Sequence, residues 1–417
     1  MGLFDRTKRG RVSLIKPFRS LRPAPGRAAE VLAPPYDVLS SAEARARADG
    51  KPWSFLHISK PEIDLDPKID PYDHAVYAKA ADNLQRMVKA GVLMRDATAF
   101  YYVYRLTRGR QVQTGLAAVA AVAHYKTNRV RKHELTTPLK EDDRVRQIEA
   151  VNAQTGPVMN GYPAAPAIDA LLAQAATGAP AVDVTADDGV RHQMWVVDDE
   201  AAITELTRAF DALPALYIAD GHHRSAAAAR VAATRGAGGS HSYFLTVNFP
   251  HHEMTILDYN RVLRDLNGRT PEALIAALKD AFSVTASDTP VRPTAAGEFG
   301  MYVAGRWHRL ALRPDLIPAN DPIGQLPITL LSRNVIEPLF NVTDPRTDKR
   351  IDFVGGGRGL AGLEQRVASG EMAVAFALYP TQMADLMAVA DAGGIMPPKS
   401  TWFEPKLADG MVNHVLD

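Results

Sequence analysis

The segment that most constrains the fold is a short apolar run followed at once by a polar turn. Residues Ala215 to Ala219 have the composition of a buried strand, and Asp220-Gly221-His222-His223-Arg224 follows directly. An Ala-rich helix is predicted from Ser225 to Thr234. In a strand-turn-helix unit, backbone N–H groups and the positive end of the helix dipole point at the space over the turn. The sequence therefore predicts a site for an anion such as phosphate.

The residue types of this turn suit a phosphoryl donor. Gly221 allows a tight bend, and Asp220 at the strand end is predicted to bind Mg²⁺ or to orient a substrate. The residues predicted to bind the donor phosphates are Gly221, His222, His223, Arg224 and Ser225. The alternative is that Asp220 is an ordinary helix cap and that the histidines and the arginine are simply exposed.

A second cluster of charge, Arg131-Lys132-His133-Glu134, precedes the turn in the chain. A carboxylate flanked by cations is what a general base needs when it acts on a hydroxyl beside phosphates, so Glu134 is the candidate base. The same run would also suit the solvated face of a helix. Residues 131 to 152 are predicted to be helical after Glu134.

The third candidate segment is Lys399-Ser400-Thr401, near the C-terminus. A lysine and two hydroxyls on a loop suit a phosphate or a carboxylate, and the tail could fold back over a site as a lid. Trp402 and Lys406 follow closely. The alternative is a basic loop with no ligand.

Two weaker signals favour structural explanations. Gly357-Arg358-Gly359-Leu360-Ala361-Gly362 matches the dinucleotide-binding pattern, but no acidic strand end follows at the required distance, so a turn and a helix start are favoured. His251-His252-Glu253 could bind a metal together with His222 and His223, although adjacent histidines on a loop are more often solvated.

With 417 residues, the chain is longer than a typical single domain. We expect a helical and extended N-terminal region at 1–95, a sheet-containing core at 96–269 and a C-terminal α/β module at 270–417. Helices are predicted at 41–48, 72–90 and 322–339, and β-hairpins at 100–123 and 295–312. The fold class is therefore α+β with a mixed sheet.

Composition excludes several classes of protein. The 48 Lys and Arg nearly balance the 47 Asp and Glu, so no overall field favours nucleic acid or an anionic membrane. There is no cysteine, and no apolar run approaches the roughly 18 residues of a membrane-spanning helix. The charged start, residues 1–11, lacks the apolar stretch of a secretory signal. We expect a cytoplasmic protein without nucleic-acid or membrane partners, and the oligomeric state is left open.

Five motifs together resemble a bacterial family of unknown function. They are Lys-Pro-Phe-Arg-x-Leu-Arg-Pro at 16–23, Pro-Pro-Tyr-Asp-Val at 34–38, His-Glu-x-Thr at 133–136, Asp-Gly-His-His-Arg at 220–224 and Pro-Lys-Ser-Thr at 398–401. The resemblance spans essentially the whole chain.

Three segments also resemble the free-serine kinases of archaea, relatives of the ParB and sulfiredoxin fold. This similarity implies a ParB/sulfiredoxin-like core, with Glu134 as base, the turn at 220–224 as donor site, and His133 with Lys399, Ser400 and Thr401 as substrate-binding residues. The order of the segments is preserved. The interval from Glu134 to Asp220 is longer than in those kinases, and the first 95 residues have no counterpart there.

The resemblance implies a kinase that makes O-phospho-L-serine from free L-serine, with Mg²⁺ and with ATP, ADP or pyrophosphate as the donor. Two other functions stay open. One is a ParB-like, nucleotide-binding regulator associated with DNA, which the balanced charge disfavours. The other is a metal-dependent phosphohydrolase that uses the histidine cluster.

Overall fold

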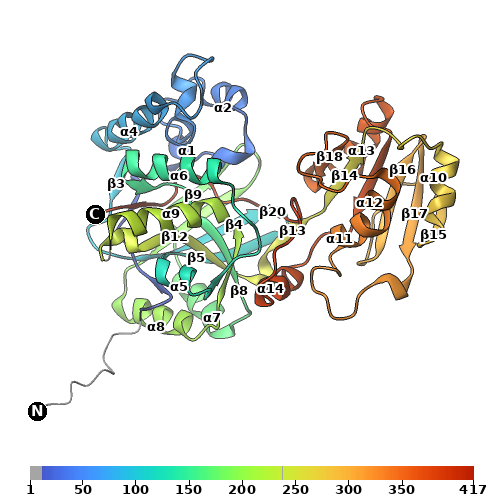
Figure 1. The fold of residues 1–417 in the computed structure, drawn as a ribbon. Coiled ribbons are helices and arrows are strands. Elements are labelled where there is room, and N and C mark those ends of the chain that lie inside the picture. The colour runs from blue at the N-terminus through green and yellow to red at the C-terminus, as the bar shows by residue number, and fades with distance from the viewer. Residues whose placement is uncertain (1–11, 237) are drawn as a thin grey trace, which may run out of the picture. The chain divides into compact units, whose positions relative to one another are not determined.

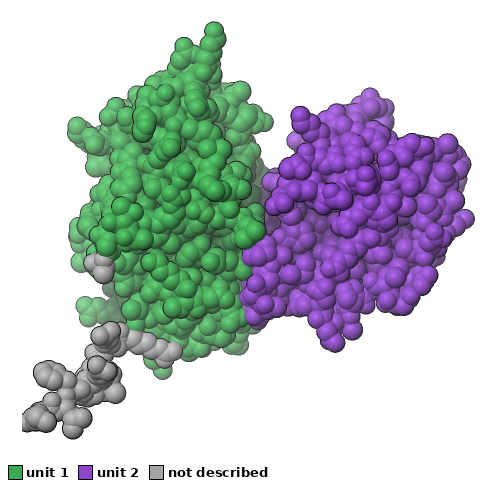
Figure 2. Space-filling view, in the orientation of Figure 1, with its two compact units in different colours: residues 1–254, 405–417 green, residues 255–404 purple. Residues whose placement is uncertain are grey.

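The computed structural model describes residues 12–236 and 238–417, so the charged N-terminal segment, predicted not to be a secretion signal, lies outside the described residues. Contacts group the chain into two units, coloured separately in Figure 2. Unit 1 runs through Met254 and also includes Pro405–Asp417, and unit 2 is Thr255–Glu404. This division differs from the three predicted modules because the N-terminal helices share a hydrophobic core with Val151 and Ala153.

A large mixed sheet forms the centre of unit 1. Its strand order is β6-β11-β8-β12-β5-β4-β10-β9, and β1 also pairs with β5. The pairs β6–β11 and β8–β12 are parallel, whereas the other pairs are antiparallel. The predicted α+β class with a mixed sheet is therefore confirmed. The strands are β1 (Ile15–Lys16), β4 (Tyr101–Arg108), β5 (Gln111–Ala121), β6 (Val130–Arg131), β8 (Val158–Tyr162), β9 (Val182–Thr185), β10 (Arg191–Val197), β11 (Leu216–Asp220) and β12 (Tyr243–Pro250).

The predicted hairpin is the β4–β5 pair, in which Tyr102 lies opposite Ala117. Small residues in β5 allow its neighbours to approach closely. A Cβ atom added to Gly115 would lie 2.6 Å from the carbonyl oxygen of Asn248 on β12. Apolar residues such as Val103 and Leu116 are fully buried, so the sheet forms the main core of this unit.

Helices cover this sheet, as Figure 1 shows. They are α5 (Val122–Lys126), α6 (Pro138–Val151), α7 (Pro166–Ala175), α8 (Glu200–Asp211) and α9 (His222–Arg235). Helix α6 begins at Pro138 rather than directly after Glu134, because proline favours the first helical position. Helix α9 begins three residues earlier than predicted, so its first turn contains His222, His223 and Arg224. Helices α6 and α9 pack against each other.

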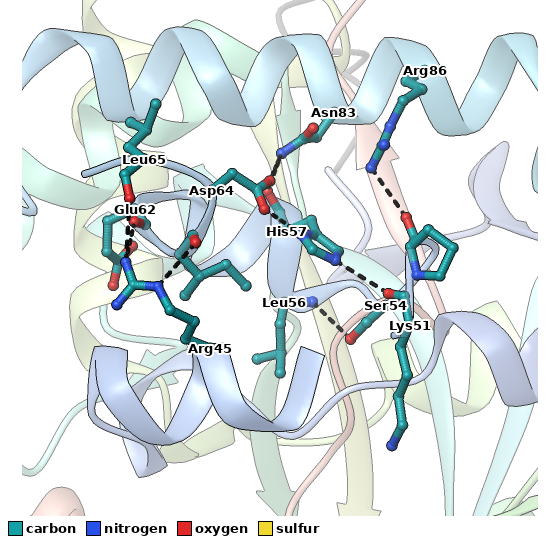
Figure 3. A network of polar contacts seen from close by, with 12 residues as sticks. Arg45, Lys51, Ser54, Leu56, His57, Glu62, Asp64, Leu65, Asn83 and Arg86 are labelled. Carbon is teal, nitrogen blue, oxygen red and sulfur yellow. Dashed lines mark hydrogen bonds and ion pairs between the residues drawn. The ribbon is translucent and has the colours of Figure 1, made fainter. Parts of the chain in front are cut away.

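The N-terminal part of unit 1 is mostly helical. The predicted helices are present as α2 (Ser41–Ala48), which begins with a capping box between Ser40 and Glu43, and α4 (His74–Lys89). Shorter elements are α1 (Ala28–Val31), η1 (Tyr36–Val38), α3 (Leu56–Ser59) and η2 (Pro61–Asp64). Figure 3 shows how side chains fix the irregular segment around η2. Arg45 donates hydrogen bonds to the carbonyl oxygens of Ile63 and Glu62, and Asn83 donates to Asp64.

A second, four-stranded sheet joins the two ends of the chain within unit 1. Its order is β3-β2-β21-β7, so the C-terminal strand lies between two strands from earlier parts of the sequence. Asn413 of the last strand donates a hydrogen bond to the carbonyl oxygen of Leu21. The strands are β2 (Ser20–Pro23), β3 (Leu93–Arg95), β7 (Ala153–Gln154) and β21 (Asn413–Val415).

Unit 2 contains a six-stranded antiparallel sheet of order β15-β17-β16-β19-β14-β18, and a separate pair of strands, β13 and β20. The predicted hairpin at 295–312 is the pair β16–β17. The strands are β13 (Thr255–Leu257), β14 (Tyr259–Leu263), β15 (Phe282–Ser287), β16 (Glu298–Val303), β17 (Arg306–Leu312), β18 (Ile351–Gly355), β19 (Val374–Leu378) and β20 (Trp402–Glu404).

The helices of unit 2 modify one prediction and confirm another. They are α10 (Pro271–Leu278), α11 (Pro327–Leu331), α12 (Glu337–Phe340), α13 (Gly359–Ala368) and α14 (Met383–Asp391). The single helix expected at 322–339 is divided, because the π-helical turn Ser332–Ile336 separates α11 from α12. The segment at 357–362 is a turn leading into α13, as favoured. In the described part of the chain, no helix combines the length and apolarity that crossing a membrane requires.

Candidate functional site

Two neighbouring strands bring the predicted residues together. Strands β6 and β11 are parallel, with Val130 opposite Leu216 and Arg131 opposite Tyr217. Because the carboxyl ends of parallel strands meet at one edge of a sheet, the segments that follow them leave the sheet side by side. His133 and Glu134 follow β6, and His222 follows β11.

The turn after β11 has the geometry expected of an anion site. Gly221 is the N-cap of α9 and has a φ of 106°, a left-handed conformation that favours glycine. The first N–H groups of α9 have no partner within the helix, because the carbonyl groups that would accept from them precede the helix start. The predicted strand-turn-helix unit is confirmed, and its helix N-terminus lies at the edge where His133 and Glu134 leave the sheet.

His133, Glu134 and His222 contact one another. Nδ1 of His222 lies 3.6 Å from Oε2 of Glu134, and the backbone N–H of His133 donates to Nε2 of His222 at 3.5 Å. Both histidines are buried, whereas the Glu134 side chain is half exposed. Burial lowers the pKa of His133 to about 4 and holds the pKa of His222 well below its usual value, despite the nearby Asp220 carboxylate. Both imidazoles are therefore neutral at pH 7.

Asp220 is held between two cations. Its Oδ2 lies 3.4 Å from Nζ of Lys406 and 3.4 Å from Nη2 of Arg224. Burial alone raises the pKa of the Asp220 carboxyl, but Lys406 and Arg224 outweigh burial and hold that pKa well below its usual range. Asp220 is therefore ionised at neutral pH.

The other predicted donor-binding residues of α9 differ in accessibility. Ser225 is completely buried, and its hydroxyl donates to the carbonyl of His222, so a structural role accounts for it. Arg224 points inward and donates to the carbonyl of Pro157 at 2.5 Å. His223 is partly exposed and accepts a hydrogen bond from the N–H of Thr137. Apart from the backbone N–H groups, His223 is therefore the accessible donor of this turn.

The segment Lys399-Ser400-Thr401 belongs to unit 2, whereas the residues above belong to unit 1. Within unit 2 this loop is anchored through its backbone. Arg261 donates to the carbonyl of Lys399, and Thr381 donates to the carbonyl of Ser400. The Ser400 hydroxyl is itself used in a bond to the carbonyl of Pro397. Their predicted role in substrate binding stays a prediction.

The sequence interpretation assigned no site role to several residues that lie beside the turn. Lys406 pairs with Asp220, and Asp409 is a buried carboxyl whose pKa burial raises to about 7, against the opposing effect of Arg224. Tyr36 and Asp37 belong to the Pro-Pro-Tyr-Asp-Val motif, which the sequence identified as a family motif without indicating a role for its residues. No sequence pattern pointed to Asp409, because only the fold brings the C-terminal tail next to the turn at 220–224.

A pocket of about 290 Å³ adjoins His223. It is formed by the N-terminal region together with helix α6, and it contains groups of both charges. Its polar lining includes Tyr36, Asp37, Lys60, Glu62, Tyr77, Lys140, Asp143, Arg144 and His223. The N-terminal region, whose contribution the sequence did not indicate, therefore forms one wall of the pocket next to the turn.

Asp220 is a poor fit for the predicted Mg²⁺ ion. Mg²⁺ needs oxygen ligands in octahedral geometry, but Oδ2 of Asp220 is already shared by Lys406 and Arg224, whose charges repel a divalent cation. Within the described ranges, the group of side chains that could hold a metal is His133, Glu134 and His222. The segment His251–Glu253 is a 3₁₀ turn and is not part of that group.

Comparison with solved structures found distant likenesses. A conserved hypothetical protein from Pyrococcus furiosus is 12% identical over 71% of this chain and 94% of its own, with a TM-score of 0.34. A free serine kinase in complex with AMP is 11% identical over 72% and 91%, with a TM-score of 0.36. SbnI from Staphylococcus aureus, with a C-terminal truncation, is 13% identical over 71% and 86%, with a TM-score of 0.36. Scores this low identify neither a shared site nor a shared activity.

A search of the curated proteins found no match. A family model does match, over residues 15–332, which is most of the chain and includes the His133–Glu134 pair, the turn at 220–224 and the pocket wall around Tyr36. This protein therefore belongs to the family described as proteins of unknown function, DUF1015.

Proposed function

We propose that this protein is a small-molecule phosphotransferase that phosphorylates an alcohol, with free L-serine as the first acceptor to test. One observation carries the proposal. A half-exposed carboxylate, Glu134, lies 3.6 Å from the side chain of the first residue of α9, so a candidate base and a helix N-terminus that favours phosphate share one place. Phosphoryl transfer to a hydroxyl needs both groups.

The chemistry assigns a role to each part. The acceptor oxygen loses its proton to Glu134 and forms a bond to the terminal phosphorus of the donor, while the bond from that phosphorus to the bridging oxygen breaks. The leaving group is ADP, AMP or phosphate when the donor is ATP, ADP or pyrophosphate. The N–H groups of the first turn of α9 and the His223 side chain stabilise charge on the phosphoryl oxygens.

Asp220 acts in this proposal as a fixed anion that orients the acceptor. Its carboxylate is ionised and held by Lys406 and Arg224, so it can accept a hydrogen bond from a neutral donor group of the acceptor without first moving a proton. The adjoining pocket supports an amino acid as acceptor, because it offers carboxylates and cations to a ligand that carries both charges.

The test is a direct assay of product. We expect O-phosphoserine when the protein is incubated with L-serine and MgATP, MgADP or pyrophosphate, detected by mass spectrometry. Glu134→Gln should lower kcat by about 100-fold or more, because it removes the base and keeps the shape of the side chain. The matched control is Glu205→Gln, which removes a carboxylate from the exposed face of α8 and should leave kcat unchanged.

Two results would contradict the proposal. One is the absence of phosphorylated product with every donor, with L-serine and with a panel of other small hydroxy amino acids. The other is transfer that proceeds equally fast in the wild type and in Glu134→Gln. Circular dichroism of both variants would establish that they are folded.

A further inference from the structure

The cluster His133, Glu134 and His222 has a property that the proposed phosphotransfer does not use. One ring nitrogen from each histidine and one carboxylate oxygen of Glu134 all lie within 4.8 Å of one another. The residues come from two parts of the chain 88 positions apart, brought together because β6 and β11 are parallel neighbours. Two imidazoles and a carboxylate are a common set of ligands for a transition-metal ion.

His133 provides the second observation. Its side chain is 2% exposed, and its Nδ1 atom has no hydrogen-bond partner among the described residues. A buried polar atom without a partner costs free energy, so it is usually a sign of an unseen water or ion. The ring is also hydrogen-bonded to the backbone of Ile218. A backbone carbonyl that accepts from one ring nitrogen is the arrangement that orients metal-binding histidines and leaves the other nitrogen available.

The spacing of the three groups suits an ion between them. Oε2 of Glu134 and Nδ1 of His222 lie 3.6 Å apart, which is longer than a strong hydrogen bond of about 2.9 Å. Ligand atoms that lie about 2.0 to 2.1 Å from a tetrahedral ion are roughly 3.3 Å apart. The Glu134–His222 pair is close to this spacing, and all three ligand atoms lie within 4.8 Å of one another, so the groups would have to close by at most about 1.5 Å around an ion.

The kinds of ligand atom select the metal. Two imidazole nitrogens with one carboxylate favour Zn²⁺, Co²⁺, Mn²⁺ or Fe²⁺, whereas Mg²⁺ requires an oxygen environment. Three protein ligands leave a further coordination position for water or another ligand, as in catalytic rather than structural zinc sites. The exposed side of Glu134 is where that position would be reached.

We propose that His133, Glu134 and His222 bind one divalent transition-metal ion. This proposal does not depend on the proposed phosphotransfer. A bound metal would nevertheless affect that reaction, because a Glu134 lone pair that binds a metal cannot accept a proton from a hydroxyl. Occupation of the site by Zn²⁺ should therefore inhibit any reaction in which Glu134 is the base.

The test measures binding in the absence of nucleotide and amino acid. The full chain is freed of metal with a chelator, and Zn²⁺ binding is measured by equilibrium dialysis. Co²⁺ is then added as a spectroscopic probe. We expect one ion per chain, displacement of Co²⁺ by Zn²⁺, visible Co²⁺ absorption typical of nitrogen and oxygen ligands, and no competition from millimolar Mg²⁺.

Three variants make the result specific. Glu134→Gln and His222→Gln should each weaken Zn²⁺ binding by more than about tenfold. The control His251→Gln changes a histidine outside the cluster and should bind Zn²⁺ like the wild type. His222 is buried, so its replacement can unfold the protein. In that case the test of metal binding is Glu134→Gln, because Glu134 is half exposed.

The proposal is overturned if the wild type binds no Zn²⁺ at micromolar concentrations, or if Glu134→Gln binds as tightly as the wild type. It is also overturned if His251→Gln alone loses binding. None of these results bears on whether the protein forms O-phosphoserine, so the two proposals succeed or fail separately.

Discussion

At the scale of single residues, the region around the turn holds two carboxyl groups, one half-buried and one buried, whose pKa values shift in opposite directions. Asp220 is paired with Lys406 and Arg224, and these charges more than offset the effect of its burial. For Asp409, burial is the dominant effect and raises its pKa to about 7. Environment, rather than residue type, therefore decides which carboxyl is charged at neutral pH.

The raised pKa of Asp409 leads to a prediction of how the free energy of unfolding depends on pH. Its pKa of about 7 in the folded protein exceeds the value of about 4 for an unfolded chain. Between these values the folded state binds a proton that the unfolded state does not, so this group lowers the free energy of unfolding as pH rises from about 4 to about 7. Asp409→Asn should flatten that decline by about 1 kcal/mol per pH unit in urea unfolding followed by circular dichroism.

The control for this pH dependence is Asp187→Asn, a change at an exposed carboxylate. It should leave the slope of the free energy of unfolding against pH unchanged. If Asp409→Asn gives the same slope as the wild type between pH 5 and pH 7, Asp409 does not titrate in that window.

At the scale of elements, the start of α9 depends on the conformation of Gly221. An added Cβ would lie 3.0 Å from Nε of Arg224, in a backbone region that already disfavours side chains. We expect Gly221→Ala to destabilise unit 1 by about 2 to 3 kcal/mol, since the left-handed conformation costs about 1 to 2 kcal/mol and the displaced Arg224 adds to it. Urea unfolding measures the stability, and pyrophosphate binding by calorimetry should weaken.

Gly50→Ala is the matched control for this change. Gly50 also has a left-handed φ, 69°, but a Cβ there would meet no atom within 4 Å. Gly50→Ala should lower the free energy of unfolding only by the backbone contribution, about 1 to 2 kcal/mol, and should leave pyrophosphate binding unchanged. Equal losses of stability and of binding in the two variants would contradict a specific role for the turn.

At the scale of the whole molecule, the C-terminal tail returns to unit 1 after the chain has formed unit 2. It inserts β21 between β2 and β7 and brings Lys406 to Asp220. The tail also buries several apolar side chains almost completely. They are Leu407, Met411, Val412 and Leu416.

Removal of the tail tests this dependence. A chain that ends at Glu404 loses four buried apolar side chains, each contributing about 1.5 to 3 kcal/mol, which together approach the total stability of a typical domain. We expect unit 1 of this chain to unfold, seen as loss of amide protection in hydrogen exchange, while protection in the sheet of unit 2 is retained. A truncated chain that keeps wild-type protection in β2 and β7 would contradict the prediction.

Many elements were predictable because their signals are local. The capping box at Ser40 and Glu43, the hairpin of β4 and β5, and the strand-turn-helix unit at Asp220 each depend on residues close together in the sequence. Helix limits were less predictable. The first turn of α9 and the π-helical interruption after α11 depend on packing and on backbone geometry that a periodic pattern does not encode.

The sequence by itself determined that a glycine bend and a helix follow a buried strand at Asp220, because residue order within a few positions dictates these three elements. Only the tertiary structure decided what surrounds that turn. Parallel pairing of β6 with β11 places His133 and Glu134 beside His222, and the returning tail supplies Lys406 and Asp409. Such contacts form between segments far apart in the chain, and the burial and charge that set each pKa exist only once those segments have packed.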